Sequence, residues 1–176
     1  MRIRDAHPER DAGACAEIYR PVVTETATSF EESAPGTEEM ARRISAAIEW
    51  LVAEVDGTVA GYAYASQHRA RAAYRWAVDV SAYVDSAHRR RGAGQGLYAT
   101  LFDRLRARGY REACAGVTLP NDASLGLHRA MGFEEVGVYR RIGWKFGRWH
   151  DVMWLQLDLA PGAPDPPAEP APASGA

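Results

Sequence analysis

The sequence lacks several features that would place it in a specialised class of protein. It holds only two cysteines, Cys15 and Cys114, which lie far apart and show none of the spacings typical of metal sites. It has no apolar run of about 18 residues, the length that a membrane-spanning helix needs. Its formal net charge is only -2, so it lacks the strongly basic face of most nucleic-acid-binding proteins.

A secretory leader and a metal cofactor are not expected either. The segment Met1–Arg10 is charged and lacks the apolar core of a signal peptide. His150 is a metal-ligating residue type, but no partner lies at a fitting spacing. We therefore expect a cytoplasmic protein with reduced, small buried cysteines, no metal, and no membrane or nucleic-acid partner.

What is present fits one globular domain followed by a tail. The chain has 176 residues, of which 47% are hydrophobic and 25% charged, enough for a substantial core. The segment Pro161–Ala176 contains only Pro, Ala, Gly, Ser, Asp and Glu. Since such a composition cannot bury apolar surface, we expect a folded domain over residues 1–160 and a disordered tail over 161–176.

The hydrophobic periodicity predicts mixed α and β elements, with an early hairpin and later helical crossovers. The hairpin signal is Asp56-Gly57, because this pair readily adopts the positive φ angles of a tight turn. A loop is expected over Gly143–Arg148. Strands are expected over Arg2–Arg4, Trp50–Val55, Thr58–Ala65, Trp76–Val84, Ala113–Leu119, Glu134–Arg141 and Trp149–Leu159, and helices over Asp11–Val22, Thr37–Ile48, Leu97–Gly109 and Asp122–Met131.

The predicted strand Trp76–Val84 separates polar from apolar side chains. Val78 and Val80 belong to its apolar face, whereas Asp79 shares the opposite face with two other polar residues, Ser81 and Tyr83. A carboxylate on the polar face of a strand suits a cleft that performs acid–base chemistry.

A glycine-rich segment, Arg89–Gly96, follows this strand and precedes a helix. Its glycines allow several backbone N–H groups to converge on one ligand, and the helix N-terminus favours a phosphate there. It is not a Walker loop, since no Gly-Lys-Ser/Thr follows, and three preceding arginines in mid-chain argue against a dinucleotide fingerprint. A plain strand–helix turn is the alternative interpretation.

Two motifs in this order resemble landmarks of the GNAT superfamily of N-acetyltransferases. The pattern Arg89-x-x-Gly92-x-Gly94 resembles the acetyl-CoA signature Q/R-x-x-G-x-G/A, which in that family also follows the fourth strand. The segment Asn121–Phe133 is similar to the second landmark, an Asn before a short helix that ends in Gly-Phe.

A narrower resemblance is to the phosphinothricin acetyltransferases, and it covers almost all of Ile3–Leu159. It implies an α/β (α+β) GNAT fold, with a twisted mixed sheet of about seven strands split between strands 4 and 5 and helices on both faces. It also implies a homodimer, acetyl-CoA as acetyl donor without a metal, and acetylation of a small amino-acid-like amine, with herbicide resistance as one consequence. The segments that carry it are Glu25–Phe30, Trp50–Ala65, Leu119–Phe133 and Gly147–Leu159.

The resemblance implies three groups of residues that hold acetyl-CoA. The strand backbone would pair with the pantetheine arm, with the Val84 N–H as the oxyanion donor. The glycine-rich loop would hold the pyrophosphate, and Asn121 would reach the arm from the neighbouring strand. The full set is Ala82, Tyr83, Val84, Arg89, Arg90, Arg91, Gly92, Ala93, Gly94, Gln95 and Asn121.

Two residues are the candidate acid–base catalysts. The family has a glutamate where this chain has Asp79, one methylene shorter, so Asp79 is the expected general base; a structurally paired aspartate is the alternative. His128 stands where many GNAT enzymes have a tyrosine that protonates the thiolate, and where the phosphinothricin group also has His. Because His128 faces inward on its helix, a hydrogen-bonded core histidine is the alternative.

Three residues are candidates for binding the acceptor. Arg71 matches the family's arginine between strands 3 and 4 and would bind a carboxylate, with a surface arginine as the alternative. Phe30 and Trp76 are expected to line the pocket, together with Tyr83 from the cofactor-binding strand. The remaining histidines, His7, His68 and His88, are interpreted as surface residues, although His88 is also a candidate for the phosphates.

Two other functions stay open from the sequence. One is a GNAT enzyme for another amine, such as a drug, a polyamine or a peptide N-terminus, which the aspartate at position 79 keeps in view. The other is a non-catalytic sensor that binds acyl-CoA, which the presence of both Asp79 and His128 argues against.

Overall fold

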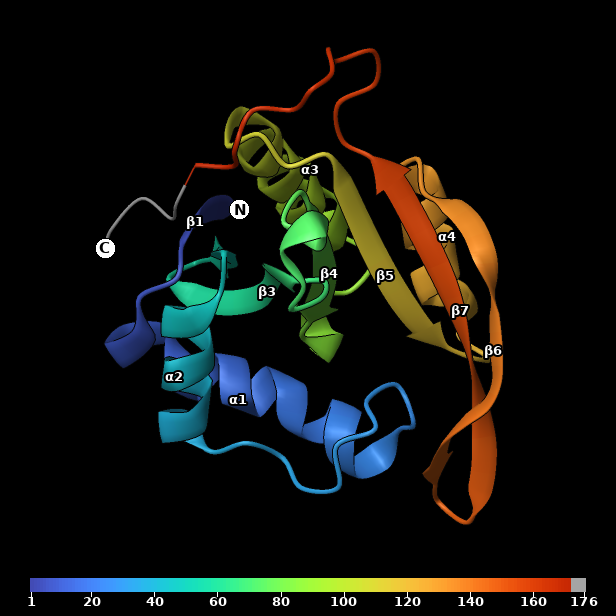
Figure 1. Cartoon of the computed structure of the whole chain (residues 1–176). Coiled ribbons are helices and arrows are strands. Elements are labelled where there is room, and N and C mark those ends of the chain that lie inside the picture. Colours follow the sequence, from blue (N-terminus) through green and yellow to red (C-terminus); the bar gives the residue numbers. More distant parts are fainter. Residues whose placement is uncertain (172–176) are drawn as a thin grey trace.

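The computed structural model describes residues 1–171 and shows one seven-stranded sheet with helices on both faces (Figure 1). The strand order is β1-β2-β3-β4-β5-β7-β6. In chain order the elements are β1 (Arg2–Asp5), α1 (Pro8–Glu25), α2 (Thr37–Ala46), β2 (Glu49–Val55), β3 (Thr58–Gln67), β4 (Ala77–Val84), α3 (Ala93–Ala107), β5 (Glu112–Thr118), α4 (Asp122–Ala130), β6 (Glu134–Lys145) and β7 (Arg148–Asp158).

The sheet opens between β4 and β5. These two strands are parallel and pair only at Ala77–Glu112, Val78–Ala113 and Asp79–Cys114, whereas the other neighbouring strands pair antiparallel over longer stretches. Beyond Asp79 the two strands diverge, as Figure 1 shows. The predicted split between the fourth and fifth strands is therefore confirmed, and we call this point the β4–β5 split.

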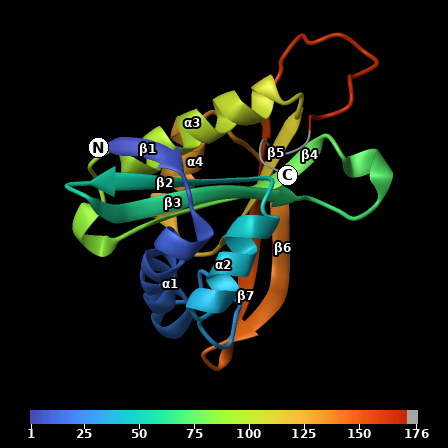
Figure 2. The same cartoon turned by 90° about the vertical axis from the view of Figure 1, so that its left-hand side faces the viewer.

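Two apolar clusters lie on opposite faces of the sheet. Leu97, Leu101 and Leu105 recur at a spacing of four along α3 and are completely buried, so one face of α3 packs against the sheet. On the other face, α1 and α2 pack around Trp50 and Tyr62 (Figure 2). Each fully buried leucine contributes about 1.5–3 kcal/mol, so these clusters hold β4 firmly between two layers.

Several predicted boundaries were wrong, most clearly in the last two strands. The expected loop Gly143–Arg148 is instead mostly strand, because the chain reverses in a tight turn in which Phe146 and Gly147 have φ of 51° and 71°. Such positive angles are typical of a two-residue hairpin turn. The result is a long hairpin end, residues 141–150, which we call the β6–β7 arm.

Residues 161–171 run along the end of the domain. Arg111 donates to the Pro164 carbonyl at 2.8 Å, and the Trp76 indole N–H donates to the Ala168 carbonyl at 2.8 Å. The division into a domain over 1–160 and a disordered tail over 161–176 stays a prediction, and residues 172–176 lie outside the described part of the chain. Within residues 1–171, no helix combines the length and apolar character that a membrane crossing requires.

Candidate active site

The open edge of β4 is the first feature of the site. Ala82, Tyr83 and Val84 pair with β3 on one side. On the side of β5, the described residues offer these three no strand partner, because pairing stops at Asp79. An open strand edge with free backbone groups accepts an extended ligand as an added strand. The expected binding of a pantetheine arm along this edge stays a prediction. The open edge is compatible with it.

The glycine-rich loop leads directly into α3. Gly92 precedes the helix with φ of 80°, in the left-handed region that glycine adopts at no steric cost. Ala93 begins the helix, so the first backbone N–H groups of α3 point towards the loop. Arg89, Arg90 and Arg91 are exposed beside it. This arrangement combines a helix N-terminus with exposed cations and suits a pyrophosphate.

Other predicted cofactor residues serve the local fold as well. Gly94 lies close to α4, and a Cβ there would stand 3.2 Å from Leu127. Asn121 caps α4, since its Oδ1 accepts a hydrogen bond from the Ser124 N–H at 3.1 Å. The next residue after Gly94, Gln95, is exposed on the first turn of α3.

Asp79 lies at the last paired position before the β4–β5 split, and His68 holds its side chain. His68 Nδ1 lies 2.7 Å from Asp79 Oδ1. Burial raises the pKa of Asp79 above its ordinary value, and the His68 hydrogen bond offsets part of that rise. Cys114 stands beside Asp79 on β5, and burial raises the pKa of its thiol to about 11. The thiol is therefore neutral at physiological pH.

The interpretation of His68 as a surface residue was wrong, since its side chain is only 16% exposed. The strand β3 continues to Gln67, two residues beyond the predicted end, and this extension carries His68 next to Asp79. The sequence signal was the alternation Tyr62, Tyr64, Ser66, His68, which continues past Ala65.

His128 is buried, with 5% of its surface exposed, and both ring nitrogens have partners. Nδ1 lies 2.8 Å from the Ser124 carbonyl oxygen, and Nε2 lies 3.1 Å from the Tyr98 hydroxyl. A neutral ring that donates to Ser124 and accepts from Tyr98 satisfies both contacts. Burial lowers the pKa of His128, and the Ser124 hydrogen bond offsets part of that effect. Its catalytic role stays a prediction.

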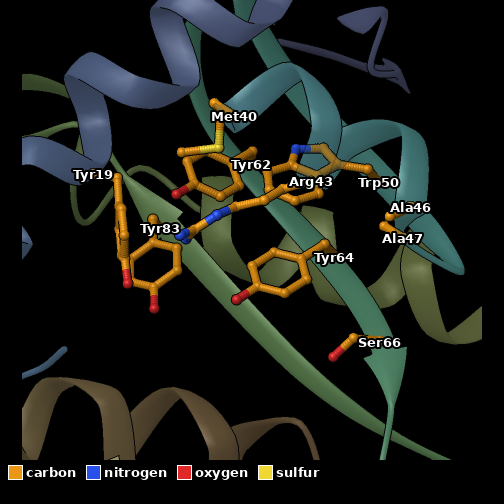
Figure 3. A pocket seen from close by; sticks show the side chains of 10 residues that line it. All are labelled: Tyr19, Met40, Arg43, Ala46, Ala47, Trp50, Tyr62, Tyr64, Ser66 and Tyr83. Atoms are coloured by element: carbon orange, nitrogen blue, oxygen red, sulfur yellow. The ribbon is translucent and has the colours of Figure 1, made fainter. Parts of the chain in front are cut away.

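A pocket of about 220 Å³ lies on the face of the sheet that carries Tyr64 and Ser66 (Figure 3). Ser66 stands directly opposite Asp79 in the β3–β4 pairing, and Tyr64 stands opposite Ser81. Arg43 also borders the pocket, but Glu31 accepts from two of its nitrogens at 2.8 and 3.0 Å. The lining residues are Tyr19, Met40, Arg43, Ala46, Ala47, Trp50, Tyr62, Tyr64, Ser66 and Tyr83.

The three predicted acceptor-binding residues lie in different places. Phe30 contacts the β6–β7 arm, since its ring fills the space beside Gly143. Arg71 is exposed in the segment between β3 and β4. Trp76 precedes β4, at the end away from the split, and binds the tail at Ala168. The structure does not bring these three side chains together.

The β6–β7 arm is tied to the loop that follows α1. The Lys145 ammonium donates to the carbonyl oxygens of Val23 and Ser29 at 2.6 and 2.7 Å. His150 is buried beside this contact, and its Nε2 lies 3.0 Å from the Lys145 carbonyl oxygen. Because Phe30 belongs to the same loop and its ring lies beside Gly143, this loop and the arm are in contact.

Comparison with known proteins connects this geometry to one family. The family model described as an acetyltransferase (GNAT) domain matches residues 4–154. A phosphinothricin N-acetyltransferase of Streptomyces viridochromogenes is 38% identical over 172 residues, covering 97% of this chain and 94% of that protein. An L-methionine sulfoximine/L-methionine sulfone acetyltransferase of Salmonella typhimurium is 35% identical over 164 residues, covering 90% and 95%.

A solved structure agrees with these relatives. The crystal structure of a phosphinothricin acetyltransferase from Sinorhizobium meliloti in complex with acetyl-CoA superimposes with a TM-score of 0.89. It shares 38% identity, and the match covers 96% of this chain and 93% of that one.

Proposed function

The chain belongs to the GNAT family and is an acetyl-CoA-dependent N-acetyltransferase, and from that premise we propose that its acceptor is a small amino-acid-like amine such as phosphinothricin or methionine sulfoximine. The observation that carries the proposal is the position of Asp79, which stands at the β4–β5 split and opposite Ser66, a residue that lines the aromatic pocket. The candidate base, the strand edge proposed to bind acetyl-CoA and the pocket proposed to bind the amine therefore lie close together.

Direct acetyl transfer needs a base, a hydrogen-bond donor to the oxyanion and a proton for the leaving thiolate. An amine is mostly protonated at neutral pH, so a base must take a proton, and Asp79, whose pKa burial raises, places a carboxylate at this point. The Val84 N–H, on the open edge of β4, is the proposed donor to the oxyanion. His128 is the proposed proton source for the leaving thiolate. No covalent enzyme intermediate is needed when the amine is held against the thioester.

The phosphate loop and β4 would hold acetyl-CoA. The N-terminus of α3 and the exposed arginines 89–91 would bind the pyrophosphate. The pantetheine would extend along Ala82–Val84 as an added strand. Asn121, at the start of α4, would contact the arm through its amide nitrogen, since its oxygen already caps the helix.

The aromatic pocket fits the side chain of a small amino acid better than a long polyamine or an aminoglycoside. Its volume is about 220 Å³, and tyrosines form much of its wall. Arg43 is already paired with Glu31 and Glu39, so it is a poor candidate for the acceptor carboxylate. We assign that role to Arg71, which is exposed on the segment between β3 and β4. Phe30, which is also exposed, would contact the bound acceptor from the loop after α1.

We also propose that the enzyme is a homodimer that pairs through the β6–β7 arm. Ile142, Trp144, Phe146 and Trp149 are all exposed on this arm. A concentration of large apolar side chains on one projecting hairpin is typical of a protein interface.

The acceptor proposal is tested by thiol release from acetyl-CoA. The acceptors are L-phosphinothricin, L-methionine sulfoximine and L-methionine sulfone, compared with spermidine and an aminoglycoside. We expect fast turnover with the first three and little with the others. Fast turnover with a polyamine or an aminoglycoside alone would contradict the acceptor class. Acetyl-CoA binding with no turnover on any amine would contradict the proposal as a whole.

A further inference from the structure

We propose that His68 is the group that takes the proton from the acceptor amine, and that Asp79 acts by positioning and polarising His68. This inference rests on the proposed function, because it assigns a role within the same acetyl transfer. It starts from the substitution in this chain of Asp79 for the family's glutamate.

The first argument is that the Asp79 carboxylate is already engaged. Its Oδ1 lies 2.7 Å from His68 Nδ1, a short contact of the kind that an imidazole N–H makes to a carboxylate. A side chain one methylene shorter than glutamate, held by a neighbour from β3, has limited reach towards a substrate. The imidazole of His68 extends this reach, so the Asp79–His68 pair reaches further than an aspartate or a glutamate side chain alone.

The second argument is the state of the other ring nitrogen. When Nδ1–H donates to Asp79, the neutral ring carries a lone pair on Nε2. Within residues 1–171, no hydrogen bond engages Nε2 of His68. An aspartate bonded to Nδ1 fixes the tautomer and stabilises the imidazolium that forms, as in the Ser-His-Asp triads. The pair therefore has the arrangement of a histidine base with its positioning carboxylate.

The third argument is where the ring lies. His68 follows β3 on the face that carries Tyr64 and Ser66, the face of the aromatic pocket. Its ring centroid is 6.3 Å from that of Trp154 on β7, and its Nδ1 contacts Asp79, so the imidazole lies at the last β4–β5 pair before the split. The acceptor amine, held between the pocket and the thioester, would meet this ring.

The groups around His68 include one carboxylate, that of Asp79, in hydrogen-bonding contact with its ring. Cys114, on β5, is a neutral thiol because burial raises its pKa to about 11. Tyr74 lies edge-on to the imidazole at 5.9 Å between centroids. Arg69 is the nearby cation and lies over the Trp154 ring at 5.9 Å. Asp79 is therefore the group that compensates the positive charge when His68 takes a proton.

The proton balance follows from these roles. Nε2 of His68 takes one proton from the acceptor ammonium, and the free amine attacks the thioester carbonyl carbon. A C–N bond forms, the C–S bond breaks, and the thiolate leaves. The second amine proton reaches the thiolate, which becomes the CoA thiol. His68 then releases its proton to solvent, so each transfer yields one amide, one thiol and one proton.

The first test observes the tautomer of His68 directly and needs no acceptor. In ¹⁵N-labelled protein at neutral pH, we expect His68 to carry its proton on Nδ1, with the signal assigned by its loss in His68→Gln. In Asp79→Asn this preference should be lost. A proton on Nε2 of the wild-type ring would overturn the inference, whatever amine the enzyme acetylates.

The second test uses kinetics with paired variants. His68→Gln should lower kcat about 100-fold or more and abolish the low-pH limb of the kcat/KM profile, with the acetyl-CoA KM unchanged. In a His68→Ala background, adding Asp79→Glu should restore part of the activity, since it supplies the longer carboxylate. His7→Gln is the matched control, because His7 is exposed at the start of α1 and should keep full activity and the same profile.

The outcomes separate this inference from the proposed function. If His68→Gln keeps the wild-type pH profile and rate, His68 only clamps Asp79 and the inference is wrong. If the wild type acetylates none of the amino acids but retains the Nδ1–H tautomer, the acceptor class is wrong and the pair stands. If Asp79→Glu fails to restore activity in the His68→Ala background, the argument from side-chain length is wrong.

Discussion

A single side chain, His128, links two helices of the core at the position where the family's general acid is expected. Its hydrogen bond to Tyr98 joins α4 to α3, and its ring packs edge-on to Phe133. The buried contacts explain its conformation without any substrate. Proton donation to a thiolate requires that one of these contacts opens during the reaction.

Substituting His128 distinguishes packing from catalysis. His128→Phe leaves the buried Tyr98 hydroxyl without its partner, so we expect the free energy of unfolding to fall by about 1–3 kcal/mol. If His128 also protonates the thiolate, the kcat of His128→Phe should fall by about 100-fold or more, measured per folded enzyme. Tyr98→Phe is the control, because it removes the same hydrogen bond and keeps the imidazole. Equal kcat values for the two variants would make His128 a core residue only.

Asp11 is a buried residue whose ionisation affects the stability of the fold. It is only 1% exposed and accepts from Arg4 at 2.7 and 2.9 Å and from the His7 N–H at 2.7 Å. Burial raises the pKa of Asp11, but the hydrogen bonds from Arg4, His7 and Arg10 outweigh it and hold the pKa well below its usual range. The carboxylate is therefore much more stable in the folded state than in the unfolded state.

The lowered pKa predicts acid sensitivity. A carboxyl group whose folded pKa is depressed contributes its full stability above its unfolded pKa, about 3.9, and loses it as the pH falls towards the folded value. Urea unfolding should show this loss as the pH falls below about 5. Asp11→Asn should be less stable by about 3 kcal/mol at neutral pH, because Arg4 loses its buried partner. A variant with the same acid dependence as the wild type would contradict this assignment.

The sequence predicted Asp79 but not its partner. Alternation along Trp76–Val84 placed Asp79 on the polar face, because a strand of period two fixes the side of each side chain. His68 was missed because β3 was expected to end at Ala65. A contact between residues 68 and 79 depends on the pairing of two strands, and a single sequence does not specify that register.

At the level of the element, the turn before α3 is the part of the donor site with the clearest steric requirement. Gly92 and Gly57 have φ of 80° and 79°, and a Cβ at either position would meet nothing within 4 Å. The two glycines are therefore matched in backbone strain and in open space, but only Gly92 belongs to the proposed phosphate site.

This match yields a paired prediction. Gly92→Val and Gly57→Val should cost similar stability, about 1–3 kcal/mol each, from a left-handed backbone with a side chain. Only Gly92→Val should raise the KM for acetyl-CoA, by about 10-fold or more, because the loop N–H groups would no longer converge. Calorimetric binding of acetyl-CoA measures the same effect. Equal affinity in both variants would remove the loop from the donor site.

The β6–β7 arm shows what local pattern reading misses. Polar and aromatic residues alternate weakly over residues 141–150, and Gly143 and Gly147 read as loop residues. In the structure Gly143 admits the Phe30 ring instead, since a Cβ there would lie 2.2 Å from it. A glycine that allows close approach of a distant side chain has the same sequence signature as one in a turn.

At the level of the whole molecule, the β6–β7 arm is the proposed interface of the homodimer. Trp144 is 59% exposed, and its ring lies edge-on to Trp149 at 5.3 Å between centroids. We expect Trp144→Arg to convert the dimer to a monomer with little loss of protomer stability, as measured by sedimentation equilibrium. Trp144→Phe is the conservative control and should remain dimeric. A wild-type protein that sediments as a monomer at micromolar concentration would contradict the dimer.

The overall fold was more accessible from sequence than the site. Element order, the early hairpin and the split between the fourth and fifth strands were all correct, because they follow from periodicity, turn residues and family landmarks. Of the residues that line the pocket, only Tyr83 was predicted, because others such as Tyr19, Arg43 and Ser66 come from three separate elements. Their proximity depends on how α1 and α2 pack on the sheet.

The most direct measurement is the initial rate of thiol release with acetyl-CoA and L-methionine sulfoximine, for the wild type and for Asp79→Asn. We predict that the wild type forms the N-acetyl product and that Asp79→Asn is slower by about 100-fold or more, while its affinity for acetyl-CoA is unchanged. An Asp79→Asn enzyme that keeps the wild-type rate between about pH 6 and pH 9 would show that neither Asp79 nor a histidine that it positions takes the proton.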